Sequence, residues 1–337
     1  MKFFEVTPEQ NNPLRVFGLL PYYDGEGFSK CHREILEKIP RIAGLGHRSC
    51  GGRVCFRTDS PSFTVRMTLE RVSVDIGIPM FGASSADVCV GPRPEARFLG
   101  LVFPTEYSDK ETTVERTFYK SAETEDVTII LPRNETVVSM SIGIEENAQL
   151  YPPTPYRNER PVVFYGSSIT EGGCPTRVGC NYVSLLSNRL NLDVINYGFS
   201  GNARGELAFA EYLIRSNPSI LVYDYDHNAP TPEWLAETHE PFFLKIREAY
   251  PELPVLMMTR PDFAPCEDHE RRRAVVRKTY ENALARGDKN VRFLDGGTFF
   301  PEEKRYECTV DACHPNDMGF SYMADAVAPV LLDFLGK

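Results

Sequence analysis

Four short segments of this sequence combine side chains that can do chemistry with residues that allow a sharp turn of the backbone. Three of them directly follow an apolar run of the length of a buried strand, and the fourth precedes a segment of helical periodicity. The segments are GSSITEG at 166–172, GFSGN at 198–202, DYDHN at 224–228 and DACHPN at 311–316. In an open parallel sheet, functional groups collect outside the carboxyl ends of the strands, so these segments are expected to form one site.

The residue types fit the transfer of an acyl group. A serine hydroxyl is a weak nucleophile that needs a base within hydrogen-bond reach, and Ser168 stands just after the first strand. His314 can be that base, and Asp311, three residues earlier, can hold its imidazole in the required tautomer. The oxyanion needs preorganised donors, for which the N–H groups of Ser168 and Gly201 and the Asn228 side chain are candidates. Each residue alone also fits a helix cap or a turn, so the prediction depends on their occurring together.

Other polar residues near these segments leave alternatives open. Arg260 ends the fourth apolar run, where it can bond a substrate hydroxyl or carbonyl, or pair with a local acid. Asp224, Asp226 and His227 are types that bind metals, but we favour ordering of the loop around the oxyanion hole. We therefore expect no metal and no other cofactor. The nine cysteines form no CxxC framework, which favours free thiols over zinc ligands.

The second half of the chain alternates short apolar runs with longer segments of helical periodicity. Runs that are apolar on both faces are typical of buried parallel strands, and the alternation with helices predicts a three-layer α/β/α fold. The runs cover residues 162–165, 194–197, 220–223, 255–258 and 291–294. Apolar residues at helical spacing over 320–334 predict a last helix, with Asn316 or Asp317 as its N-cap.

The first half has a different pattern. Apolar and polar residues alternate over 63–69 and again over 138–144, where Val138 and Met140 share one face. Period-two alternation between turn clusters predicts an antiparallel β-sandwich of the jelly-roll type, with one helix around 30–39. A proline-rich stretch then predicts a stiff connector. The expected domains are the sandwich, the connector and the α/β domain, over 1–150, 151–159 and 160–337.

Composition excludes several classes of protein. The chain has 37 basic and 47 acidic residues, a formal net charge of −10, so a nucleic-acid-binding surface is not expected. No apolar stretch is long enough to span a bilayer, and acidic residues and a proline occupy the place of a signal-peptide core near the start. We therefore expect a cytoplasmic protein without a membrane partner.

The four segments occur in the order found in the SGNH, or GDSL-type, serine hydrolases, and the second half of the chain resembles this superfamily. The resemblance implies a flavodoxin-like α/β/α fold and esterase chemistry. Residue by residue, it implies Ser168 as nucleophile, Gly201 and Asn228 as oxyanion donors, and Asp311 and His314 as the rest of the triad. Two segments depart from the usual pattern: a serine precedes the nucleophile in place of aspartate, and the third lacks its Gly-x-Asn-Asp form. The second departure leaves open whether Asn228 or a neighbour is the donor.

A sandwich ahead of such a domain is similar to the two-domain carbohydrate esterases that remove acetyl groups from plant polysaccharides. This implies an acetylated oligosaccharide, or another small ester, as substrate. One alternative is a lipid or thioester acylhydrolase with the same triad, which would need a long apolar groove. A second is a sugar-binding protein without catalysis, against which the intact serine, histidine and aspartate argue. The sequence leaves a homo-oligomer open.

Overall fold

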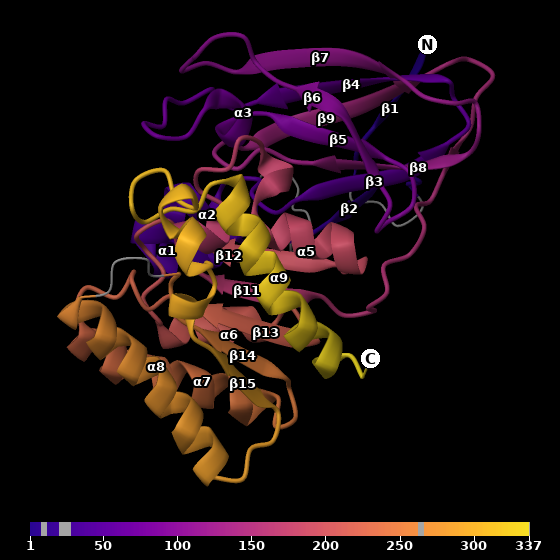
Figure 1. Ribbon diagram of the computed structural model, residues 1–337. Helices are drawn as coiled ribbons and strands as arrows, with labels where there is room; N and C mark the ends of the chain where they lie inside the picture. Colours follow the sequence, from indigo (N-terminus) through magenta and orange to yellow (C-terminus); the bar gives the residue numbers. More distant parts are fainter. Residues whose placement is uncertain (8–11, 20–27, 262–265, 337) are drawn as a thin grey trace.

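Two antiparallel β-sheets form the first part of the structure, a computed structural model that describes residues 1–7, 12–19, 28–261 and 266–336. The first sheet has the strand order β1 (Lys2–Glu5), β9 (Val137–Ile144), β4 (Ser62–Leu69) and β7 (Thr112–Tyr119). The second has the order β10 (Leu150–Tyr151), β3 (Arg53–Thr58), β8 (Glu125–Ile130), β5 (Ala86–Val90) and β6 (Arg97–Val102), and β2 (Arg15–Phe17) also pairs with β3. Apolar side chains of both sheets share one core, and Figure 1 shows the sheets stacked in indigo and magenta. The predicted antiparallel sandwich is confirmed.

The alternation read from the sequence matches the buried faces of the strands, with one exception. Met140 is buried as predicted, but Val138 is only partly buried. The pairing of β4 with β9 shifts between Thr68 and Leu69, so that Leu69 pairs with Val137, which is fully buried. An irregularity of this kind turns the next side chain to the other face of the sheet. The prediction for Val138 was therefore wrong because simple alternation cannot reveal the shift.

Within the described ranges, five parallel strands form the sheet of the second part. Their order is β12 (Val194–Gly198), β11 (Val162–Gly166), β13 (Ile220–Asp224), β14 (Val255–Met258) and β15 (Val291–Leu294). Each predicted apolar run is one of these strands, and the ends agree to within one residue. The order second, first, third, fourth, fifth is that of flavodoxin-like sheets, in which ligands bind where the order reverses. The reversal lies at β11, the strand that precedes Ser168.

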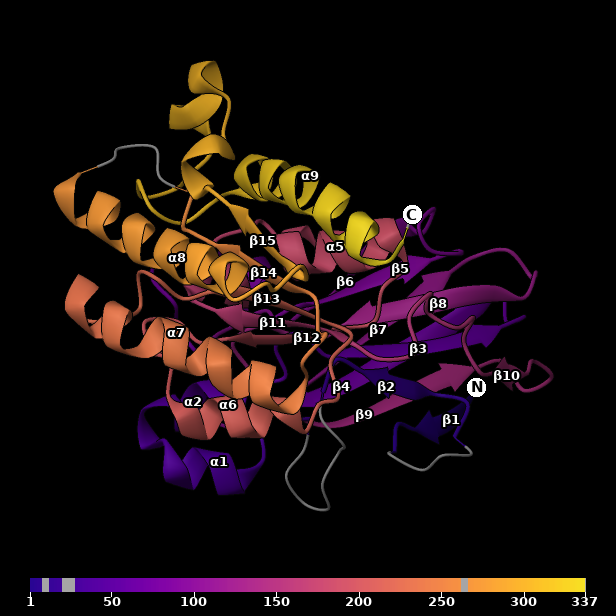
Figure 2. The same ribbon diagram turned by 90° about the horizontal axis from the view of Figure 1, so that it is seen from below.

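Helices cover both faces of this sheet (Figure 2). One face carries α5 (Tyr182–Leu190) and α9 (Asp317–Phe334), and the other carries α6 (Leu207–Ile214), α7 (Pro232–Ala249) and α8 (Glu267–Ala285). Asn316, not Asp317, caps α9, because its side chain accepts the N–H of Gly319 at 3.1 Å. The predicted three-layer α/β/α fold is confirmed. In the described part of the chain, none of the helices has the length and hydropathy to cross a membrane.

Two short helices from the beginning of the chain join this second core. The helix predicted around 30–39 is α1 (Arg33–Lys38), and α2 (Ala43–Gly46) follows it. Ile35, Ile39 and Ile42 are buried in one cluster with Val163 and Tyr165 of β11. Figure 2 shows α1 and α2, in indigo, beside α6 rather than beside the strands of the sandwich. By packing, residues 31–42 therefore belong to the α/β layer, although they lie between the sandwich strands β2 and β3 in the sequence.

Candidate active site

The candidate nucleophile stands at the tight turn between β11 and a one-turn helix. Ser168 is the first residue of α4 (Ser168–Glu171), and the side chain of Ser167 caps this helix by accepting the N–H of Ile169 at 3.2 Å. The turn needs glycine at position 166, because a Cβ there would lie 2.2 Å from the carbonyl oxygen of Asp224. The close approach of β11 and β13 thus brings the Ser168 hydroxyl to the carboxyl edge of the sheet.

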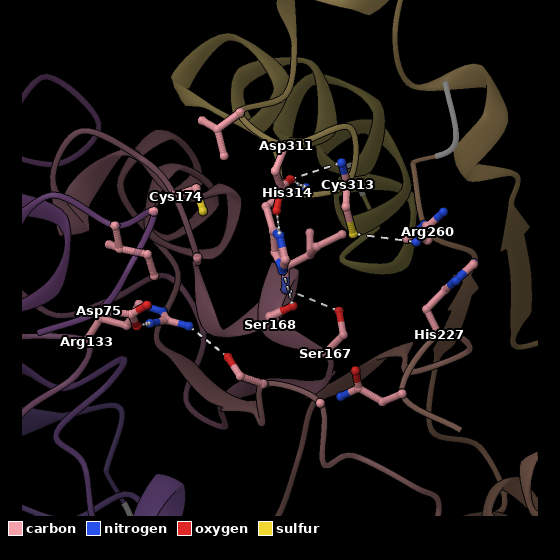
Figure 3. A pocket seen from close by; sticks show the side chains of 18 of the residues that line it. Asp75, Arg133, Ser167, Ser168, Cys174, His227, Arg260, Asp311, Cys313 and His314 are labelled. Atoms are coloured by element: carbon pink, nitrogen blue, oxygen red, sulfur yellow. Dashed lines mark hydrogen bonds and ion pairs between the residues drawn. The ribbon is translucent and has the colours of Figure 1, made fainter. Parts of the chain in front are cut away.

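A continuous chain of hydrogen bonds joins the three predicted triad residues (Figure 3). The Oγ of Ser168 lies 2.8 Å from Nε2 of His314, and Nδ1 of His314 lies 2.7 Å from Oδ2 of Asp311. Burial raises the pKa of Asp311, but hydrogen bonds from the His314 backbone and ring outweigh it and hold that pKa below its usual range. An ionised Asp311 accepts the Nδ1 proton, which leaves Nε2 free to accept the proton of Ser168.

The turn between Asp311 and His314 fixes the imidazole from the backbone side. Oδ1 of Asp311 accepts the N–H groups of His314 at 2.7 Å and Cys313 at 3.1 Å. Ala312 adopts a left-handed conformation with φ +67°, which an alanine holds only when its surroundings enforce it. One carboxylate therefore orients the ring and the loop that carries it.

Three donors can stabilise an oxyanion above Ser168. A Cβ built on Gly201 would meet nothing within 4 Å, so this residue faces open space in the pocket, with φ +68°. The N–H groups of Ser168 and Gly201 donate to no other group in the described part of the chain. Asn228 uses one Nδ2 hydrogen to bond the carbonyl of Phe199 at 2.7 Å, which leaves the other for a ligand. This arrangement meets the requirement for preorganised donors.

The acidic residues of the third segment order the loops, as the sequence suggested. Asp224 accepts a hydrogen bond from Thr170 at 2.8 Å, and Asp226 accepts the N–H groups of His227 and Arg260 at 2.9 and 3.1 Å. Both carboxyl groups are buried, and burial raises the pKa of Asp226 to about 6. Of the side chains of this segment, His227 and Asn228 line the pocket, and Asn228 keeps one Nδ2 hydrogen that its bond to Phe199 does not use.

The triad opens into a pocket of about 700 Å³ that both parts of the chain line. Figure 3 shows Arg260, His227 and Cys313 on one side of His314, and Cys174, Arg133 and Asp75 on the other. Arg260 donates to the sulfur of Cys313 at 3.5 Å. Arg260 thus lies on the pocket wall, as expected for a residue that can contact substrate.

The sequence did not identify which residues of the first part of the chain line the pocket. A segment just ahead of α3 (Met80–Ala83) reaches the same cavity, and so does a single residue from the loop that follows β8. These residues are Asp75, Ile76, Gly77, Ile78 and Arg133. The side chain of Ile76 is 96% exposed at the mouth. No spacing in the sequence links these positions to the triad, because their approach depends on how the two parts of the chain pack.

A second missed feature is a fully buried carboxylate directly behind the nucleophile. Glu171, at the end of α4, lies 3.1 Å from Lys30 and 3.1 Å from Arg133. Arg48 lies 3.8 Å from the same carboxylate. Burial alone would raise the pKa of Glu171, but these three cations outweigh it and lower that pKa to about 2. The three cations come from the first part of the chain, so the contact between the two parts is ionic at this point.

In the described residues, side chains form no group of three or more that could hold a metal ion. All nine cysteines have free thiols.

Comparison with known structures shows the same fold along the whole chain. A GDSL-like lipase from Bacteroides ovatus superposes with a TM-score of 0.85 at 22% identity, covering 99% of this chain and 98% of that one. A salicylyl-acyltransferase from a tetracycline biosynthetic pathway superposes with a TM-score of 0.78, also at 22% identity, with 99% and 98% covered. An acetyl xylan esterase from the rumen bacterium Butyrivibrio proteoclasticus superposes with a TM-score of 0.66 at 12% identity, with both chains covered completely. At these identities the likeness is one of fold.

Sequence comparison gives the family. None of the curated proteins compared with the chain matches it. The profile described as the N-terminus of SGNH hydrolase-type esterases matches residues 28–150. The profile of the GDSL-like lipase/acylhydrolase family matches residues 159–332, more than half of the chain and the part that holds Ser168, Asp311 and His314. The chain therefore belongs to the GDSL-like lipase/acylhydrolase family and is an SGNH-type acylhydrolase.

Proposed function

We propose that this protein is a serine esterase that removes acetyl or other short acyl groups from carbohydrates. The observation that carries the proposal is the hydrogen-bonded chain from Ser168 through His314 to Asp311 at the floor of an open pocket. A nucleophile, a base and an orienting carboxylate in this geometry are the requirement for acyl transfer to serine.

The reaction follows from these positions in two half-reactions. His314 Nε2 takes the hydroxyl proton while Ser168 Oγ attacks the ester carbonyl, and the oxyanion accepts hydrogen bonds from Ser168 N, Gly201 N and Asn228 Nδ2. Collapse of this intermediate breaks the ester bond, and the imidazolium gives its proton to the leaving alcohol. Water, deprotonated by His314, then attacks the acyl-enzyme by the same route and releases the carboxylic acid with free Ser168.

The chemistry of the pocket supports a hydroxyl-rich leaving group. Its polar side chains are spread over both walls, where each can exchange hydrogen bonds with sugar hydroxyls. They are Asp75, Ser167, Ser200, His227, Asn228 and Arg260. The larger apolar side chains come from three separate segments of the lining: Ile76 and Ile78 from the first, Ile169 from the second and Val310 from the third. A long acyl chain would need a continuous apolar groove, so this lining favours a short acyl group over a lipid. The shared fold with an acetyl xylan esterase agrees with this proposal.

The test compares acyl length and leaving group on the wild-type protein. We expect release of p-nitrophenol from the acetyl ester to exceed release from the octanoyl ester. We also expect mass spectrometry to show loss of acetyl units from acetylated oligosaccharides, with Ser168→Ala as the inactive control. A preference for the octanoyl ester would favour a lipid acylhydrolase. Absence of turnover on every ester, with tight binding of the oligosaccharides, would favour a sugar-binding protein.

A further inference from the structure

Strand β12 leads to the loop that carries Gly201, which we call the oxyanion loop. Two arginines from the first part of the chain hold this strand, one at each end. At its start, Arg53 of β3 donates to Asp193 at 2.5 Å and to the carbonyl of Val194 at 3.0 Å. After its end, Arg133 donates to the hydroxyl of Ser200 at 2.8 Å. Both arginines are at least nine-tenths buried. In both contacts a buried arginine of the first part donates to the second part of the chain. Only the contact of Arg133 adjoins Gly201, the residue that supplies an oxyanion donor.

All four terminal hydrogens of the Arg133 guanidinium have partners within the protein. Nη2 donates to Glu171 at 3.1 Å and to Ser200, while Nη1 donates to Asn134 and lies 3.5 Å from Asp75. Nε is buried as well. Although Arg133 lines the pocket, it has no terminal hydrogen left for a substrate. Its contacts are those of a residue that holds other groups in place.

Glu171 connects this arginine to both backbone donors of the oxyanion hole. Its carboxylate accepts hydrogen bonds from the hydroxyl of Ser200 and, at 3.2 Å, from the Ser200 backbone N–H. Ser200 directly precedes Gly201, the second backbone donor. Glu171 itself ends the helical turn that begins at Ser168, the first backbone donor. A single carboxylate therefore sets the distance between the two turns of the backbone on which the oxyanion depends.

We propose that Arg133 is a positioning residue through which the first part of the chain fixes the geometry of the oxyanion hole. The inference deepens the proposed function and rests on it. Through one planar guanidinium, Arg133 fixes Glu171 behind the nucleophile, Ser200 on the oxyanion loop and Asp75 on the pocket wall that the first part of the chain supplies. Such a fork cannot shift toward one partner without moving away from another.

The expected effect is one on kcat rather than on binding. Complete removal of one oxyanion donor lowers kcat by about a hundred- to a thousandfold. Loosening the loop that carries a donor should cost less, so Arg133→Gln should lower kcat on p-nitrophenyl acetate by about ten- to a hundredfold. KM should stay within about threefold, because the hydrogen bonds to the oxyanion form only as charge develops.

Arg53→Gln provides the matched control. It removes an equally buried arginine, an ion pair between the same two parts of the chain and a bond to the same strand, but at the end away from the pocket. We expect Arg53→Gln to lower the melting temperature at least as much as Arg133→Gln while kcat stays within about twofold of wild type. If the two variants lose kcat equally, Arg133 acts only through stability and the inference is wrong.

Ser200→Ala tests the same contact without removing a buried charge, and it decides the matter if Arg133→Gln does not fold. It should lower kcat by about tenfold, and the double variant should lose little more than Arg133→Gln alone, because both changes break one connection. Unchanged kcat in Ser200→Ala, or losses that multiply in the double variant, would overturn the inference. A wild-type protein without esterase activity would overturn the proposed function as well, whereas active wild type with fully active Arg133→Gln would overturn this inference alone.

Discussion

Replacing Asn228 by alanine removes the one proposed oxyanion donor that comes from a side chain. Its Nδ2 group has two hydrogens, of which one bonds the carbonyl of Phe199 at 2.7 Å and the other remains for the substrate. The backbone N–H groups of Ser168 and Gly201 are unaffected by the change. Asn228→Ala therefore reduces the proposed hole from three donors to two.

The structure separates the expected effect on catalysis from that on stability. Loss of one oxyanion donor costs about 2.7–4 kcal/mol of transition-state stabilisation, which is about a hundred- to a thousandfold in kcat. The carbonyl of Phe199 keeps two other donors, the N–H groups of Asn202 at 2.9 Å and Ala203 at 3.3 Å. No buried acceptor is left unpaired, so the free energy of unfolding should fall by only about 1 kcal/mol.

The assay measures kcat and KM for p-nitrophenyl acetate and the free energy of unfolding in urea. Asn158→Ala is the control, because its amide likewise donates to backbone carbonyls, those of Arg160 at 2.8 Å and Asp193 at 2.9 Å; its Oδ1 also accepts the Asp193 N–H at 2.8 Å. Asn158 lies just before β11, at the edge of the sheet away from the pocket. We expect Asn158→Ala to lose at least as much stability as Asn228→Ala, and a loss of kcat only in Asn228→Ala.

The reasoning would be refuted if Asn228→Ala kept kcat within about fivefold of wild type while remaining folded. A rise in KM at constant kcat would also contradict it, because such a change would mean that Asn228 binds the substrate before charge develops. If His227→Ala rather than Asn228→Ala lowered kcat, the donor assigned to the third segment would be the wrong residue.

Three further predictions follow from the triad and from Glu171. Ser168→Ala should keep the fold and lower kcat by several orders of magnitude, and a fluorophosphonate adduct should map to Ser168; an adduct on the preceding serine would contradict the assignment. His314→Ala should be as damaging as Ser168→Ala, and Asp311→Asn milder, since the backbone N–H of His314 can still bond the side-chain oxygen; equal kcat in all three variants would contradict this order. The pKa of Glu171 is 4.5 in the unfolded chain and about 2 in the folded protein. Its ionisation therefore contributes on the order of 3 kcal/mol to stability above about pH 4.5, and this contribution is lost as the pH falls toward 2. Urea unfolding of Glu171→Gln should show a shallower loss of stability over this window, and parallel curves for the two proteins would contradict the pairing.

The parallel sheet was predictable because its signals are local. Five apolar runs, each closed by a polar or glycine-rich segment, gave the strands of the α/β domain to within one residue. The sandwich was predictable as a class, since alternation persists through its strands. The register shift beside Thr68 was not predictable, because one extra residue leaves no trace in the composition of the strand.

The candidate site, too, was predictable from the sequence only in part. The structure brings Ser168, His314, Asp311, Gly201 and Asn228 together because each follows a strand or precedes a helix of one sheet, and that order is visible in the sequence. The sequence did not show which residues of the first part of the chain form the pocket wall. This wall depends on packing between elements that are distant in the sequence, which no periodicity of either element specifies.

The burial of Ile35, Ile39 and Ile42 against β11 has a consequence for biosynthesis. These side chains are synthesised about 120 residues ahead of β11 (Val162–Gly166), the strand that covers them. At ordinary rates of elongation the interval is on the order of 10 s, during which the nascent chain carries an uncovered apolar segment between β2 and β3. Chaperones that bind nascent chains should therefore recognise this stretch, and release should follow synthesis of the parallel sheet.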